Sequence, residues 1–247
     1  MNVQGKNCAG RLVKTKVRTV SVVIPAFQEE KYIAATLTRL VNIDHLIEII
    51  VVDGGSKDKT AKVARRFTNK VYVLRERGIA RARNYGAKRA CGDVLVFLDA
   101  DVITTTDFVE KVLETFSDST VVGATCSIMP VKPRFHEKVF FHLHNSLTRI
   151  LARFKPHCRG EFFVARRSEF LKVNGFNESL PCSEDHELAF RLSKRGRFVF
   201  IKDLTVYESL RRFRKLGLFM VVGIWLANYL SFVIRGKNVS KVWLPVR

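Results

Sequence analysis

Cysteine is scarce in this chain of 247 residues, and its spacing argues against two common kinds of cysteine site. The cysteines are odd in number and none forms a C-x-x-C pair; they are Cys8, Cys91, Cys126, Cys158 and Cys182. We therefore expect reduced thiols in a cytosolic setting, not a disulfide framework or a zinc site. Residues 1–19 are basic and polar, with no apolar segment before the first predicted strand, so we expect no signal peptide.

Acidic residues are missing from one long part of the chain. The net charge is +20, from 43 basic and 23 acidic residues, and residues 211–247 contain eight lysines and arginines but no aspartate or glutamate. Residues 132–167 contain nine basic and two acidic residues, whereas residues 20–120 are roughly balanced. A surface of this kind attracts phosphate on nucleic acid, anionic lipid or a phosphorylated substrate; a merely solvated surface is the alternative.

Strand and helix patterns alternate regularly in the first half of the chain. The predicted strands are the apolar runs at 19–26, 46–53, 71–74 and 93–99. The predicted helices are the periodic segments at 29–41, 56–67 and 79–90. This order predicts an α/β fold, with a Rossmann-like and mostly parallel central sheet covered by helices on both faces. Neither G-x-G-x-x-G nor a P-loop follows the first strand, where PAFQEE stands instead.

The second half of the chain is less regular. Its expected elements are helices at 106–116 and 135–154, a strand at 121–129, a hairpin at 197–209 and one long carboxyl-terminal helix from 210 onward. Phe162 and Phe163 are weighed as walls of an acceptor site and, alternatively, as core residues.

Polar residues follow three of the predicted strands, at Pro25–Glu29, Asp53–Ser56 and Asp99–Asp101. Ligands of open α/β sheets bind beyond the carboxyl ends of the strands, so we expect these segments on one rim. Asp99 and Asp101 project to the same side of an extended segment, and the small Ala100 between them would let a ligand approach closely. Their oxygens suit Mg²⁺ or Mn²⁺, although acids at a strand end can also simply face water.

Two loops have a structural and a functional interpretation. Asp53 precedes two glycines and Ser56, which begins a helix whose amino end favours anions; a plain turn residue is the alternative. Glu184 and Asp185 begin a predicted helix, where a carboxylate serves either as an N-terminal cap or as a general base.

Six segments occur in a fixed order: IPAFQEE, VVDGGSKDKT, G-x-x-x-A-R-N-x-G at 78–86, VFLDADV, VNGFNE and SEDHELAFRL. This set resembles glycosyltransferase family 2 over about residues 19–210. The resemblance implies the GT-A fold and an enzyme that transfers a sugar from a nucleotide-diphosphate sugar with inversion. It divides the chain into a basic extension at 1–18, a GT-A domain at 19–210 and a basic, hydrophobic carboxyl-terminal helix at 211–247.

The resemblance also implies a role for each matching residue. The residues bordering or binding the nucleobase and ribose would be Pro25, Phe27, Glu29 and Asp53. Asp99 and Asp101 would hold the ribose and the diphosphate bound to Mg²⁺ or Mn²⁺, with Ala100 between them at the donor. Asp185 would be the general base, with Glu184 beside it.

An arginine among Arg77, Arg81 and Arg83 would reach the nucleotide, and the sequence leaves the choice open. Phe27 stands where tyrosine is commoner, and Gly54 stands where many members have a second aspartate. The first departure removes a hydroxyl donor near the base. The absence of Q-x-x-R-W after the SED segment argues against a processive polymerase.

Residues 216–234 contain no charged side chain, and as a helix they would extend about 28 Å. Three interpretations stay open: a membrane span, a helix in the membrane interface and a buried helix. With the basic excess, this segment favours a peripheral or anchored enzyme at the cytoplasmic face of an anionic membrane. The resemblance extends to a branch with polyprenyl-phosphate or glycolipid acceptors. Two alternatives to an active transferase are a nucleic-acid-binding protein and a catalytically silent family member. We do not expect nucleic acid as the partner, because acidic residues at three strand or helix ends would repel its phosphates in the absence of a metal.

Overall fold

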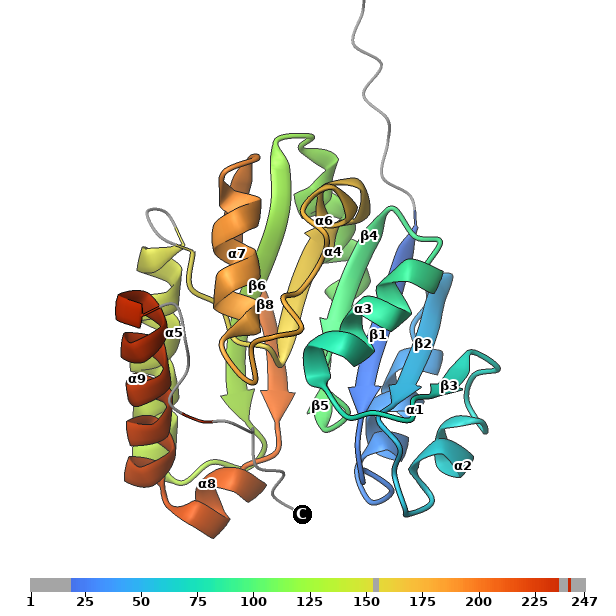
Figure 1. The fold of residues 1–247 in the computed structure, drawn as a ribbon, viewed down its shortest axis with the longest axis horizontal. Helices are drawn as coiled ribbons and strands as arrows, with labels where there is room; N and C mark the ends of the chain where they lie inside the picture. The colour runs from blue at the N-terminus through green and yellow to red at the C-terminus, as the bar shows by residue number, and fades with distance from the viewer. Residues whose placement is uncertain (1–18, 153–155, 236–239, 241–247) are drawn as a thin grey trace, which may run out of the picture.

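The computed structural model describes residues 19–152, 156–235 and 240 (Figure 1). The predicted extension at 1–18 and the end of the predicted carboxyl-terminal segment lie outside the described residues.

Within the described residues, one sheet of eight strands has the order β3-β2-β1-β4-β7-β6-β8-β5. The strands are β1 (Val20–Ala26), β2 (Ile47–Asp53), β3 (Val71–Val73), β4 (Val94–Leu98), β5 (Val102–Ile103), β6 (Val121–Pro130), β7 (Phe162–Arg166) and β8 (Arg197–Glu208). The first four strands form a parallel half. In the other half, β7 runs antiparallel to β4 and β6, and β8 runs parallel to β6.

Helices cover both faces of the sheet. They are α1 (Ile33–Val41), α2 (Thr60–Ala64), α3 (Ile79–Arg89), α4 (Phe108–Ser117), α5 (Phe135–Leu151), α6 (Arg167–Lys172), α7 (Glu184–Ser193), α8 (Arg211–Leu216) and α9 (Leu218–Arg235). The apolar side chains of α1, α2 and α4 share one core cluster with the sheet, and those of α3, α6 and α7 share another. A third cluster joins α5, α8 and α9 beyond the sheet, at one edge of the molecule in Figure 1.

The parallel half confirms the predicted α/β architecture. Strand β4 is buried on both faces: Val94, Val96 and Leu98 lie in one core cluster, and Leu95 and Phe97 lie in the other. An unbroken apolar run is the pattern that such a strand requires.

Helices α1 and α2 begin later than the sequence predicts, because the segments before them bind each other. The backbone N–H of Gln28 donates to Ser56 Oγ at 2.7 Å, and that of Glu29 donates to Thr60 Oγ1 at 2.7 Å. Backbone groups that bind side chains of a neighbouring loop are not free to continue a helix.

The predicted hairpin at 197–209 is wrong. Residues 197–208 form the single strand β8, parallel to β6, with an irregularity where the pairing moves from Cys126–Ile201 to Ser127–Thr205. The polar residues Lys202 and Asp203 are exposed at this point, so a bulge absorbs what the sequence presents as a turn.

The predicted single helix at the carboxyl end is also wrong, because Gly217 divides it into α8 and α9. This glycine has a φ of 84°, a left-handed conformation that glycine adopts without a steric penalty and that ends a helix. Among the described residues, no helix combines the length and apolarity needed to cross a membrane.

Candidate active site

The loops after β1 and β2 form one rim, as the strand-end rule predicts. Asp53 Oδ1 accepts a hydrogen bond from the backbone N–H of Ser56 at 3.0 Å, and the Ser56 hydroxyl also contacts it. Ser56 Oγ in turn accepts from Gln28, which has a φ of 56°. A non-glycine residue in the left-handed region costs free energy, so its presence here indicates a loop held in shape by its partners. Asp53 therefore stabilises the turn after β2, which is the structural interpretation considered for it.

The three candidate arginines lie in different places. The guanidinium carbon of Arg77 lies 4.1 Å from the centroid of the Phe27 ring, at the rim. Arg81 forms ion pairs with Glu76 and Glu178 and is partly exposed. Arg83 is fully buried below the rim. The aromatic ring that replaces the commoner tyrosine thus has a cationic neighbour, which it binds through its π face.

Arg83 joins the end of β4 to the start of α7. Its Nη2 donates to Asp99 Oδ1 at 2.9 Å and to the Gly160 carbonyl at 2.7 Å. Its Nη1 donates to Glu184 Oε1 at 2.8 Å. A buried guanidinium needs carboxylate and carbonyl partners of this kind, and its rigid planar shape fixes their relative positions.

Asp101 faces a different arginine from Asp99. Arg211, at the start of α8, donates from both terminal nitrogens to Glu29 at 2.6 Å and lies 3.2 Å from Asp101 Oδ2. The loop after β1 and the start of α8 are therefore tied together beside the predicted metal ligand. Asp99 and Asp101 are each paired with one cation, and Ala100 between them is buried.

Arg159, Glu161 and Glu208 complete the charged site, and sequence reasoning missed them. Arg159 Nη2 donates to Glu161 at 2.8 Å and to Glu208 at 2.5 Å. Both Arg159 and Glu161 lie just before β7, which runs antiparallel to β4, so the start of β7 lies beside the end of β4. The antiparallel pairing of β7 with β4, had it been predicted, would have placed Arg159 and Glu161 at the site.

The site contains more acid than base, and the pKa values reflect it. Burial, with neighbouring carboxylates adding to it, raises the pKa of Asp99 from 3.8 to about 7 and that of Asp101 from 3.8 to about 6. Burial also raises the pKa values of Glu184, Asp185 and Glu208. Hard oxygen donors with uncompensated negative charge fit Mg²⁺ or Mn²⁺, so the residues present are suited to such an ion.

A second set of potential metal ligands lies nearby. Within the described part of the chain, the group of three or more whose ligand atoms lie within 4.8 Å of one another is Cys158, Asp185 and His186. Asp99 and Asp101 are outside this group. Burial raises the pKa of the Cys158 thiol well above its ordinary value and lowers the pKa of His186 to about 4. Mg²⁺ and Mn²⁺ prefer oxygen ligands, which Asp99 and Asp101 offer, whereas this second group includes a sulfur and an imidazole nitrogen.

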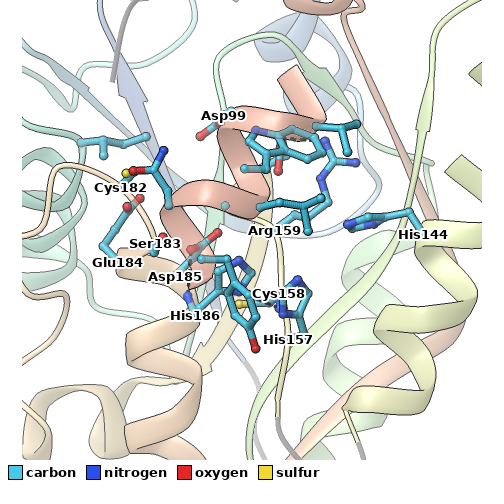
Figure 2. Close-up of a pocket in the computed structure, with 18 of the residues that line it drawn as sticks. Asp99, His144, His157, Cys158, Arg159, Cys182, Ser183, Glu184, Asp185 and His186 are labelled. Atoms are coloured by element: carbon cyan, nitrogen blue, oxygen red, sulfur yellow. Dashed lines mark hydrogen bonds and ion pairs between the residues drawn. The ribbon is translucent and has the colours of Figure 1, made fainter. Parts of the chain in front are cut away.

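A cavity of about 310 Å³ extends from Asp99, Glu184 and Asp185 to α5 and α9. Figure 2 shows Asp99, Glu184 and Asp185 on one side and His144, which projects from α5, on the other. The apolar and aromatic part of the wall comes from α5 and α9, through Phe140, Leu147, Leu151, Val222, Trp225, Leu226 and Tyr229. Between the two ends, His157 stacks on His186 with ring centroids 4.0 Å apart.

Asp185 and Glu184 differ in their surroundings although both line the cavity. Glu184 is bonded to Arg83, whereas Asp185 Oδ1 accepts from the backbone N–H of His186 at 2.8 Å. The preceding Ser183 has a φ of 61°, another left-handed residue at the site. Of the two interpretations weighed for Phe162 and Phe163, the structure supports core residues and not walls of an acceptor site, because both rings are fully buried in the two core clusters beside the sheet.

Comparisons with known proteins agree with this architecture. The model of the family described as Glycosyl transferase family 2 matches residues 21–175. The succinoglycan biosynthesis protein ExoA of Rhizobium meliloti is 27% identical over 205 residues, which cover 74% of this chain and 61% of that protein. A dolichyl N-acetyl-alpha-D-glucosaminyl phosphate 3-beta-D-2,3-diacetamido-2,3-dideoxy-beta-D-glucuronosyltransferase of Methanococcus voltae is 36% identical over 107 residues, 39% of this chain and 33% of that protein. The chain thus spans less than two thirds of the length of these relatives.

Solved structures share the fold at low sequence identity. The mannosyltransferase PcManGT from Pyrobaculum calidifontis, in complex with GDP-Man and Mn²⁺, matches with a TM-score of 0.66 and 21% identity, over 86% of this chain and 65% of that one. S. aureus TarS 1-349 in complex with UDP-GlcNAc matches with a TM-score of 0.62 and 21% identity, over 87% of this chain and 73% of that one. The fold is therefore GT-A. Because the family model matches more than half of the residues of this chain, the chain belongs to glycosyltransferase family 2.

Proposed function

We propose that this chain transfers a sugar from a nucleotide-diphosphate sugar to a lipid-linked acceptor, with inversion at the anomeric carbon. The observation that carries the proposal is the position of the cavity. It places Asp99, Glu184 and Asp185 at one end, and the aromatic wall of α5 and α9 at the other. Chemistry at the acid end and apolar contact at the far end suit an amphiphilic acceptor.

The donor lies at the rim in this proposal. Phe27 with Arg77 borders the nucleobase, while Pro25, Glu29 and Asp53 shape the loops around the base and ribose. The related folds that contain GDP-Man or UDP-GlcNAc support a nucleotide sugar, without specifying which one.

Asp99 and Asp101 would hold a divalent cation together with the donor diphosphate. When bound, Mg²⁺ or Mn²⁺ would neutralise charge on the departing nucleoside diphosphate. The residues of this chain can prepare that region themselves: Arg83 and Arg211 hold the two carboxylates in place before any ligand arrives.

Asp185 is the proposed general base. The acceptor oxygen forms a bond to the anomeric carbon, the bond from that carbon to the diphosphate breaks, and the proton of an acceptor hydroxyl passes to Asp185. Because burial raises the pKa of Asp185, this carboxylate is a stronger base than an exposed aspartate. Glu184 acts as a positioning residue through Arg83.

The test compares Asp185→Asn with the wild type in two assays, donor binding by calorimetry and transfer to a glycolipid extract whose acceptors offer hydroxyl groups. We expect unchanged donor affinity and a loss of transfer of at least about 100-fold, the usual contribution of general-base catalysis. Undiminished transfer would remove Asp185 from this role. Failure of the wild type to bind any nucleotide sugar would overturn the function itself.

A further inference from the structure

Helices α5 and α9 each expose a row of large apolar side chains. On α5 the spacing of four, four, four and three residues places the row on one face: Phe135, Val139, Leu143, Leu147 and Ile150, which are 84%, 42%, 66%, 53% and 58% exposed. On α9 the corresponding row is Phe219, Leu226, Leu230 and Ile234, at 91%, 55%, 53% and 77%. Single exposed apolar residues are common, but two adjoining rows indicate an interaction surface.

The two helices are packed against each other, so the rows belong to one region. His144 of α5 lies 6.1 Å from the Trp225 ring of α9, and Phe213 of α8 contacts both Phe141 and Trp225. Figure 1 shows α5 and α9 side by side at the edge of the molecule. Leu147 and Leu226 belong to the exposed rows and also line the cavity, so the cavity opens where the rows meet.

The charges around this region have one sign. Glu137 is the single acidic residue between positions 131 and 152, and it is 5% exposed because it caps its own helix. Positions 211–235 contain no acidic residue. The exposed basic residues on α5, on α8 and in the loop before α5 are Lys132, Arg134, Lys138, Arg149, Arg214 and Lys215. Apolar side chains beside cations, with no exposed acid among them, complement an anionic lipid surface.

We infer that the exposed rows of α5 and α9 dock on the surface of an anionic bilayer, with the mouth of the cavity facing the lipid. The apolar side chains enter the interface and the basic residues contact lipid phosphates. A second copy of this chain fits this surface less well, because two faces with the same positive charge repel each other. The inference extends the expected role of residues 211–247 to α5, and it does not depend on the identity of the donor sugar.

The test is co-sedimentation of the full chain with vesicles of phosphatidylcholine alone or mixed with phosphatidylglycerol. We expect binding to the mixed vesicles, weaker binding to the neutral ones and a decrease with added salt. The double substitution Leu143→Glu and Leu230→Glu should weaken binding by at least about tenfold, because two apolar side chains leave the interface and two negative charges enter. The matched control is Leu46→Glu, since Leu46 is 95% exposed just before β2, and it should bind like the wild type.

Absence of binding to the mixed vesicles, or equal binding by the double variant, would overturn the inference. A dimer in solution that the double substitution dissociates would also overturn it, and would assign the surface to self-association. Nucleotide-sugar affinity is measured on the same proteins in the absence of lipid. It should be unchanged in the double variant, so loss of docking is distinguishable from failure of the proposed function.

Discussion

Replacing Asp101 with asparagine should make the metal-free protein more stable at alkaline pH, although it removes a carboxylate that contacts an arginine. Asp101 is largely buried, and neighbouring Glu29 and Glu161 add to the cost of its charge. Together these effects outweigh the attraction of Arg211, so the pKa of Asp101 is raised from 3.8 to about 6. Arg211 keeps both hydrogen bonds to Glu29 in the variant.

The sign and the size follow from that shift. A carboxyl group whose pKa is higher in the folded state binds its proton more tightly there, so its contribution to stability is complete below about pH 4 and is lost as the pH rises through about 6. The shift corresponds to about 3 kcal/mol as an upper bound. Asparagine carries no such penalty, so Asp101→Asn should match the wild type near pH 4 and exceed its free energy of unfolding by about 1–3 kcal/mol at pH 8.

Urea unfolding of the two proteins in EDTA, across this pH range, measures the difference. The control is Asp44→Asn, because Asp44 is exposed and should give the same stability as the wild type throughout. Addition of Mn²⁺ at pH 8 should stabilise the wild type and leave Asp101→Asn unchanged. A variant that is less stable than the wild type at pH 8 would refute the reasoning, since Asp101 would then be a net stabilising residue without metal.

Two further substitutions test the framework of the site. Arg83→Met should destabilise the protein by about 3–5 kcal/mol at pH 8, because it leaves buried carboxylates without their cation. The loss should be smaller at pH 5, where those carboxylates take up protons. Equal losses at both pH values, measured by urea unfolding, would contradict this. Gly86→Ala should lower the free energy of unfolding by about 1–3 kcal/mol, because the added Cβ would lie 2.4 Å from Val23 Cγ1. In the control, Gly223→Ala, the added Cβ meets nothing within 4 Å, so this substitution should be neutral or stabilising. Thermal unfolding of both variants measures the difference.

The parallel half of the fold could be predicted because its rules are local. Apolar runs and helical periodicity give the order of β1 to β4, and the carboxyl ends of parallel strands then bring Asp53 and Asp99 to one rim. The burial of Arg83 could also have been predicted from the sequence. On α3 it shares a face with Ala80 and Ala87, at spacings of three and four residues, whereas Arg81 lies on another face.

The remaining parts depend on contacts between distant segments. Arg211 reaches Glu29 across 182 positions, and Arg159 reaches Glu208 across 49, so no pattern in either segment indicates these pairs. The same holds for β8, where the exposed Lys202 and Asp203 read as a turn. Pairing with β6 along the whole strand overrides that local preference.

The most direct test of the account is a calorimetric titration of UDP- and GDP-sugars into the wild type and Asp101→Ala, each with Mn²⁺ and with EDTA. The account predicts that one sugar nucleotide binds the wild type in a Mn²⁺-dependent way and that Asp101→Ala lowers this affinity by at least about tenfold while its unfolding transition stays cooperative. Binding that is equal with Mn²⁺ and EDTA, or equal in the two proteins, would contradict the assignment of this rim to a metal-bound donor.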